Sequence, residues 1–278
     1  MALCKYCGQD AGLLRLAHSE CHRSHEQGVT KVRQLVLSSV TEDRDPSRIR
    51  AEIEQAARRG WIRYDDTQAL VLRTWHEAID RVVQDGVLAS EEEQRINALS
   101  GALGYDLAKL PEDAKLKLVM GRVLREVMEG RIPPCPTAVD GAHPFNLQRS
   151  EQMVWLFRRV RYIEEKTRRR YVGGSSGMSF RVMKGVYYRV GQSRGRVEEH
   201  TSMEQADVGL LGLTTKHLYF AGDRRSLRLP YSKLVTIRPY NNGIGVVRDT
   251  ATARPQLFVT GNGWFVYNLT MNLSAMAN

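Results

Sequence analysis

The sequence lacks any apolar run that approaches the roughly 20 residues a helix needs to cross a bilayer. The opening stretch, MALCKYCGQD, also lacks the apolar core of a secretory signal peptide. We therefore expect a cytoplasmic protein without a transmembrane segment. Cysteine is scarce as well, and three of the 4 cysteines fall within the first 21 residues. This placement favours a metal site over a secreted disulfide framework.

Signatures of common enzyme classes are incomplete. His76 and Glu77 begin an H-E-x-x-H pattern, but Asp80 occupies the position of the second histidine, which is therefore missing. The glycine-rich stretch 171–177 is not followed by Gly-Lys-Ser/Thr, so we expect a hairpin tip that leads into a strand over Met178–Val190. Because no pair of nucleophile and base can be named, the sequence favours a non-enzymatic protein.

Positive charge is concentrated in the C-terminal half of the chain. From Arg149 onward, 21 Lys and Arg residues face 9 Asp and Glu residues, whereas the first 148 residues carry 20 against 22. Hydrophobic and charged contents of 42% and 26% are ordinary for a globular protein. The asymmetry indicates that the C-terminal half has an anionic partner.

A metal-ligand pattern, C-x2-C-x10-H-x2-C, is formed by Cys4, Cys7, His18 and Cys21. The C-x-x-C-G turn points two thiolates at one ion, and ligands at i and i+3 on a first helical turn converge on the same point. We predict a structural Zn²⁺, because no open coordination position or general base is evident. The pairing resembles treble-clef and LIM-type knuckles. His25 is an alternative partner for Cys21, and His22 is a further alternative.

Helical periodicity follows from His25 to about Gly130. Asp45 precedes Pro46 as an N-cap, and Ser90 with Glu93 forms a capping box. Gly104 and Gly130 are typical helix stops. These signals predict a compact bundle of helices.

The stretch Ala78–Ile96 resembles the turn between two helices of TerB-like domains, through an Asp-Gly pair followed by Ser and Glu. The resemblance nominates Asp80, Asp85 and Glu91 as acids linked to metal. The residues themselves support a plainer alternative, in which Asp85-Gly86 ends one helix and the acidic run from Glu91 favours the positive end of the next.

Short, mostly alternating apolar runs over Val208–Tyr240 predict strands. The runs break at Thr214, Gly222 and Pro230. Turn residues at these breaks and at Asn241–Gly243 predict three or four strands joined by hairpins. The apolar residues from Trp264 to Thr270 cannot alternate as in a strand, so we predict a helix capped by Asn262.

The runs Gly209–Phe220, Leu229–Val235 and Ile237–Ile244 resemble bacterial PH-like and GRAM-like domains. The resemblance implies a PH-like β-barrel or sandwich closed by one C-terminal helix. The fold class is then α+β, with a zinc knuckle and a helical bundle ahead of the barrel. We expect a zinc knuckle over 1–27, a TerB-like helical domain over 28–130, a proline-rich linker over 131–147 and the PH-like domain over 148–278.

Basic residues recur where the PH-like domain begins, and we expect them to cluster near one hairpin as a face that binds an anion or a partner. They are Arg158, Arg159, Arg161, Lys166, Arg168, Arg169 and Arg170. Such cations can bind phosphate oxygens, or can simply form a solvated face. The PH-like resemblance implies a binding or adaptor protein that recognises an anionic membrane surface or a protein partner. The alternative is a nucleic-acid-binding protein that uses the Arg-rich hairpin and the knuckle together.

Overall fold

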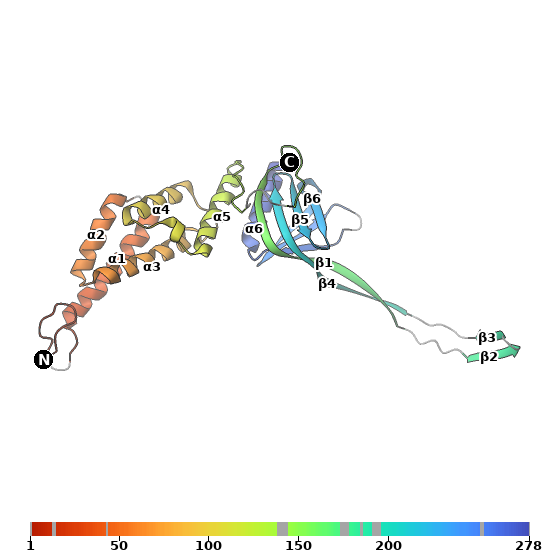
Figure 1. Cartoon of the computed structure of the whole chain (residues 1–278), viewed down its shortest axis with the longest axis horizontal. Helices are drawn as coiled ribbons and strands as arrows, with labels where there is room; N and C mark the ends of the chain where they lie inside the picture. The colour runs from red at the N-terminus through yellow and green to blue at the C-terminus, as the bar shows by residue number, and fades with distance from the viewer. Residues whose placement is uncertain are drawn as a thin grey trace. The chain divides into compact units, whose positions relative to one another are not determined.

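The computed structural model describes residues 2–12, 15–42, 44–137, 144–172, 178–183, 186–190, 196–250 and 253–277, with the backbone alone for those between 168 and 200. The chain divides into two compact units, 1–133 and 134–278, each of which is described by itself. The division falls inside the stretch predicted to be a linker. Figure 1 shows helices in the first unit and mainly strands in the second.

The first unit begins with a knuckle of turns, which an antiparallel bridge between Leu3 and Asp10 closes. Its helices are α1 (Ser19–Thr41), α2 (Pro46–Arg59), α3 (Tyr64–Val82), α4 (Ser90–Leu103), the short 3-10 helix η1 (Leu107–Lys109) and α5 (Glu112–Met128). Helix α1 crosses the predicted boundary between residues 27 and 28 without a break. The knuckle and the bundle therefore share one helix.

The predicted apolar stripes form the core of the bundle. On α1, Val32, Leu35, Val36 and Val40 are buried, and they belong to the same core as Trp75 of α3. The predicted cap of α2 is confirmed, because the Asp45 carboxylate accepts a hydrogen bond from the Ser47 N–H at 3.0 Å. The predicted stop at Gly104 is also confirmed, with a φ of 72°.

The start of α4 differs from the predicted capping box. The N-cap is Ala89 rather than Ser90, and the Ala89 N–H donates to the Glu92 carboxylate at 3.0 Å. Glu93 instead accepts a hydrogen bond from Nη2 of the buried Arg125 at 2.8 Å. Because a buried guanidinium needs a carboxylate partner, this tertiary contact takes Glu93 away from the cap.

The second unit is built on a seven-stranded antiparallel sheet with the order β6-β5-β4-β1-β9-β8-β7. The strands are β1 (Met153–Val172), β4 (Arg196–Thr214), β5 (His217–Gly222), β6 (Ser226–Pro230), β7 (Leu234–Tyr240), β8 (Gly243–Arg248) and β9 (Gln256–Val259). A short 3-10 helix, η2 (Tyr231–Lys233), joins β6 to β7. The predicted breaks coincide with the ends of β4, β5 and β6.

Helix α6 (Gly263–Ala277) follows the last strand and packs against the sheet. Phe265 meets Trp155 of β1 with ring centroids 4.7 Å apart. The Phe265 N–H donates to Asn262 Oδ1 at 3.0 Å, which confirms the predicted cap. Glycine begins the helix because a Cβ at Gly263 would lie 1.7 Å from the Tyr240 carbonyl oxygen.

The curled antiparallel sheet forms a half-barrel, and with its C-terminal helix it has a PH-like fold (Figure 1). The protein is therefore α+β, with helices ahead of the barrel, as the sequence predicts. Within the ranges that the structure describes, none of the helices is both long and apolar enough to cross a membrane.

Strand β1 reaches well beyond the rest of the sheet. It pairs with β4 as far as Val172, whereas β9 pairs with Arg161–Glu164. In the described part of the sheet, β1 and β4 therefore continue past Glu164 as a two-stranded ribbon (Figure 1). An irregularity before Val160 gives Arg159 a φ of 57°, which is uncommon for a residue with a side chain.

The stretch Met178–Val190 contains two strands rather than the single one predicted. β2 (Met178–Met183) and β3 (Val186–Val190) pair with each other, while β1 pairs with β4. Alternation alone could not locate this reversal, because a period of two residues looks the same in one long strand and in two short ones. The predicted hairpin tip at 173–177 lies outside the described residues.

A buried carboxylate connects the start of β1 with the turn between β4 and β5. Glu151 accepts hydrogen bonds from the Thr214 hydroxyl, from His217 Nδ1 at 2.8 Å and from the Tyr219 hydroxyl at 3.0 Å. The Gln148 N–H donates another at 2.8 Å. Burial acts to raise the pKa of Glu151, but these hydrogen bonds outweigh burial and hold that pKa below its usual value of 4.5.

Replacing Glu151 with Ala is expected to destabilise the second unit by roughly 2–4 kcal/mol, because buried donors lose their acceptor. Since the folded-state pKa lies below the unfolded value, the carboxylate's contribution is complete above pH 4.5 and is lost as the pH falls through the folded value. Hydrogen exchange of β4 and β5 amides measures both effects. The exposed Asp223, replaced by Ala, is the control. Equal exchange in Glu151→Ala and the wild-type protein would contradict the prediction.

Candidate metal centre and basic cleft

The predicted metal ligands lie together in the knuckle of the first unit. The sulfur atoms of Cys4, Cys7 and Cys21 and a ring nitrogen of His18 all lie within 4.8 Å of one another. The Sγ atoms of Cys7 and Cys21 are 3.4 and 3.7 Å from His18 Nδ1. A tetrahedral zinc ion with bonds of about 2.3 Å to sulfur and about 2.0 Å to nitrogen sets these atoms about 3.5 Å apart. The spacing fits an ion of that size.

Local backbone geometry brings the four side chains together. Cys4 and Cys7 lie in a turn that the Gly8 N–H closes on the Cys4 carbonyl at 2.9 Å. Gly8 has a φ of 74°, a conformation that glycine adopts without steric cost. His18 is the N-cap of α1 and Cys21 lies in the first turn of that helix. The i, i+3 pair of His18 and Cys21 therefore lies at the start of a helix, as the sequence predicts.

The ring of His18 is oriented by a second contact. Its Nε2 lies 2.9 Å from the Asp10 carbonyl oxygen and donates to it, which leaves Nδ1 as the acceptor that faces the thiols. Metal-bound imidazoles commonly have such a partner. His22 pairs with a nearby glutamate at 3.6 Å, and His25 Nδ1 lies 2.8 Å from the Gly60 carbonyl oxygen. The structure brings His18 to the thiols and places the two alternatives elsewhere.

The thiols of the cluster have unequal pKa values. Burial acts to raise the pKa of Cys4, but hydrogen bonds with the backbone of Cys7, His18 and Tyr6 lower it to about 6. Burial and the neighbouring thiol groups raise the pKa of Cys21 to about 11. The raised pKa of Cys21 means that all three thiols can be deprotonated together only if a positive charge lies among the sulfur atoms. A divalent cation supplies that charge.

Two of the three acids nominated by the TerB-like resemblance have separate partners. Asp80 Oδ1 is 2.6 Å from Lys117 Nζ, and Asp85 Oδ1 accepts the Val87 N–H at 3.0 Å. Glu91 lies in the first turn of α4. Among the described residues, the knuckle cluster is the one group of three or more His, Cys, Asp or Glu side chains close enough to share an ion.

The basic residues predicted to form one face are spread along β1. Arg158, Arg159 and Arg161 are exposed, whereas Arg168–Arg170 lie in the two-stranded ribbon. At about 3.3 Å per residue, the eleven steps from Arg159 to Arg170 span roughly 36 Å. In the ribbon, the register places Glu199 and Glu198 of β4 opposite Arg169 and Arg170. The seven residues therefore do not form one cluster.

A different set of cations gathers around one end of the barrel. Arg225 of the β5–β6 turn, Arg248 at the end of β8 and Arg254 ahead of β9 join Lys166 around a cavity of about 340 Å³. We call this cavity the basic cleft; its other lining residues are Tyr162, Glu164, Glu165 and Gln256. Of these cations, only Lys166 belongs to the predicted basic face. Arg225 lies far in sequence from Arg248 and Arg254, and the three share no motif.

Carboxylates neutralise part of the basic cleft. Arg225 Nη2 is 2.7 Å from Glu164 Oε1, and Lys166 Nζ is 3.8 Å from a glutamate of β4. Arg254 Nη1 donates to a backbone carbonyl at 3.4 Å. Arg248 and Arg254 form no ion pair with the residues that the structure describes. The cleft therefore presents to solvent two guanidinium groups that form no ion pair with a described carboxylate, and Glu165 lines the same cleft without an ion pair to the described residues.

Polar groups line the inner wall of the basic cleft. Burial raises the pKa of Tyr162 to about 12, so its hydroxyl stays protonated and donates to Glu164 at 3.1 Å. Gln256 Nε2 donates to the same hydroxyl at 2.7 Å. The Gln256 side-chain oxygen is buried and has no hydrogen-bond partner in the described ranges. That oxygen is shielded from solvent, so it is not a surface acceptor of the cleft.

No protein-family model matches the chain, and no curated protein matches its sequence. Among solved structures, the chain is similar to one in the crystal structure of the complex of PDZ-RhoGEF DH/PH domains with GTP-gamma-S activated RhoA. The match covers 94% of this chain and 75% of that chain, with 10% identity and a TM-score of 0.21. At this TM-score the likeness has no bearing on fold or function, which rest on the strand order and the site geometry.

Proposed function

We propose that this chain is a non-enzymatic binding protein, stabilised by a structural Zn²⁺, whose PH-like unit recognises an anionic membrane surface. The observation that carries the proposal is the basic cleft, where Arg248 and Arg254 have no carboxylate partner among the described residues and can bind oxygen anions. The excess of positive charge in the second half of the chain adds long-range attraction to such a surface.

The chemistry of the cleft defines the head group that it accepts. Two guanidinium groups favour a phosphate-bearing head group, because each can form paired hydrogen bonds with its oxygens. An acidic protein segment offers negative charge without a phosphate group, and it is the other outcome that a binding experiment distinguishes.

The Zn²⁺ would be held by Cys4, Cys7, His18 and Cys21. Three thiolates and one imidazole fill a tetrahedral shell and leave no open position for substrate, which favours a structural role. Because His18 and Cys21 stand at the start of α1, the ion would fasten the knuckle to the first turn of that helix.

A second candidate function is nucleic-acid binding through the ribbon of β1 and β4. The observation that favours it is the extension of these strands beyond β9, with Arg168–Arg170 along one of them. A two-stranded ribbon has the width of the major groove of duplex DNA. Tyr171, in the same ribbon, could stack on a base.

Metal analysis of the purified chain is expected to find stoichiometric zinc, and Cys7→Ser or His18→Ala should lower the zinc content because each removes a ligand. His22→Ala is the matched control, since His22 is exposed and lies outside the cluster. Inductively coupled plasma mass spectrometry gives the content. Zinc that persists in both ligand variants, or that is lost in the control, would overturn the ligand assignment.

The pair Arg248→Ser/Arg254→Ser is expected to weaken binding to phosphatidylcholine vesicles that contain a phosphoinositide by about tenfold or more, since each basic residue near an anionic surface contributes about 1 kcal/mol. Vesicle sedimentation measures the change. Arg158→Ser/Arg238→Ser removes the same charge from exposed positions outside the cleft. An equal loss in both pairs would show general attraction without a site, and an unchanged affinity in the first pair would refute the role of the cleft.

For the second candidate, replacing Arg168, Arg169 and Arg170 with Ser should weaken duplex DNA binding and reduce the salt slope by about 1 for each phosphate that the ribbon no longer neutralises. Fluorescence anisotropy across a salt titration measures the slope, and circular dichroism checks that the variant is folded. Failure of the unmodified chain to bind DNA or RNA would eliminate this function.

A further inference from the structure

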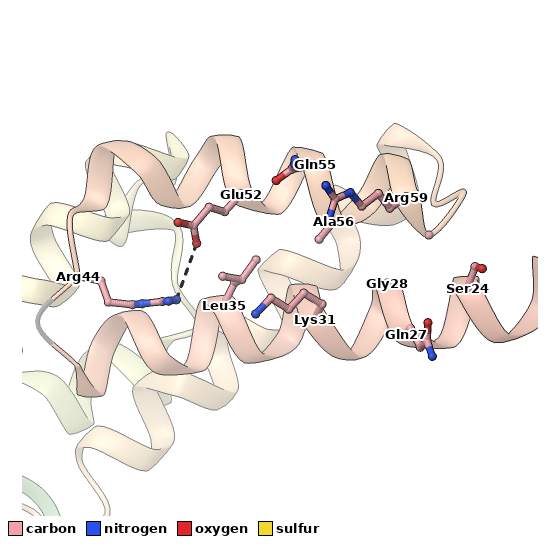
Figure 2. Close-up of a pocket in the computed structure, with 11 residues that line it drawn as sticks. Ser24, Gln27, Gly28, Lys31, Leu35, Arg44, Glu52, Gln55, Ala56 and Arg59 are labelled. Atoms are coloured by element: carbon pink, nitrogen blue, oxygen red, sulfur yellow. Dashed lines mark ion pairs between the residues drawn. The ribbon is translucent and has the colours of Figure 1, made fainter.

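A groove on the first unit runs between α1 and α2, and Figure 2 shows the residues that line it. One face of α1 contributes Ser24, Gln27, Gly28, Lys31 and Leu35. One face of α2 contributes Glu52, Gln55, Ala56 and Arg59, and Gly60 follows the end of that helix. Arg44 lies in the loop between α1 and α2. The cavity of about 590 Å³ has the size of a small-molecule site.

Small residues form the floor of this groove. A Cβ at Gly28 would lie 2.6 Å from the Gly60 Cα, so the two helix backbones meet there without side chains between them. Ala56 and Leu35 are buried and extend the floor. The groove is therefore a consequence of close helix packing, and its floor is apolar.

The walls of the groove carry uncommitted hydrogen-bond donors. Lys31 on α1 and Arg59 on α2 stand on opposite walls (Figure 2), are exposed and form no ion pair in the described part of the chain. Gln27 and Gln55 are also exposed and make no side-chain hydrogen bond there. The carboxylate among the lining residues, Glu52, faces Arg44 at 3.9 Å, as the dashed line in Figure 2 marks.

We propose that this groove binds a small phosphoryl-bearing molecule. The guanidinium of Arg59 can hold two phosphoryl oxygens at once, and the ammonium of Lys31 can neutralise the remaining charge from the opposite wall. Two uncommitted cations match a dianion, and a phosphoryl group offers the acceptor oxygens that the amides of Gln27 and Gln55 require. The site is distinct from the basic cleft, because it belongs to the other unit.

The apolar floor of the groove also indicates what kind of group the phosphoryl-bearing ligand carries besides its phosphoryl group. A molecule that places its phosphoryl group between the two cations would lay its remaining part over Leu35 and Ala56. A nucleoside or another flat, weakly polar body suits that surface. The phosphoryl group is the part common to all such ligands, so inorganic pyrophosphate is a suitable first probe.

Isothermal titration calorimetry of the full chain with pyrophosphate and with ADP tests the proposal. Saturable binding is expected, and Lys31→Ser/Arg59→Ser should weaken it by about tenfold or more, because charge-assisted hydrogen bonds from both walls are lost. If ADP binds more tightly than pyrophosphate, the nucleoside contacts the floor of the groove. If the two bind equally, the phosphoryl groups account for the affinity. Both results support the site.

The matched control is Arg50→Ser/Arg58→Ser, which removes two cations of α2 that do not line this groove. It should leave the affinity within about twofold, because screened charges outside a site contribute little. Absence of saturable binding, or an equal loss in the control, would overturn the proposal. The proposal would also be overturned if Arg248→Ser/Arg254→Ser lost affinity for the anion and Lys31→Ser/Arg59→Ser did not. The anion would then belong to the basic cleft. Thermal melting confirms folding, and the single variant Lys31→Gln, expected to lose affinity severalfold, tests the same site if the pair does not fold.

Discussion

The second unit depends on the pairing of β1 with both β4 and β9. These two ladders turn β4–β6 and β7–β9 into one sheet, because β1 is the strand that stands between them. The same strand buries Trp155 and Tyr162 inside the barrel and carries Lys166 at its rim. Core packing and the basic cleft are thus positioned by one element. Beyond the barrel, β1 continues with β4 as a two-stranded ribbon, which carries Arg168–Arg170 away from that core.

Helix α1 has the corresponding role in the first unit. Its N-cap and first turn present His18 and Cys21 to the other two cysteines, and its buried stripe forms part of the bundle core. On the next turn, His25 Nδ1 donates to the Gly60 carbonyl, which ties the start of α1 to the end of α2. The helix then lines one wall of the groove beside α2. Knuckle, core and groove therefore share a single helix.

Local signals in the sequence predicted much of this architecture. Asp45 before Pro46, Gly104 and Asn262 act at the ends of helices as expected, because capping depends on neighbouring backbone groups. The predicted cap of α4 was wrong by one residue, because Glu93 pairs with the buried Arg125, which is distant in sequence. The reversal between β2 and β3 was missed for a different reason, because alternation does not change across it.

The amino-acid sequence by itself determined the metal-ligand spacing, the helical and β halves, and the excess of positive charge after Arg149. These properties are local or compositional, so they can be read along the chain. Only the tertiary structure decided that His18 rather than His25 faces the thiols, and that Arg225, Arg248 and Arg254 surround one cleft. Strand order and helix crossing bring such residues together from distant positions, and no spacing rule along the chain encodes that proximity.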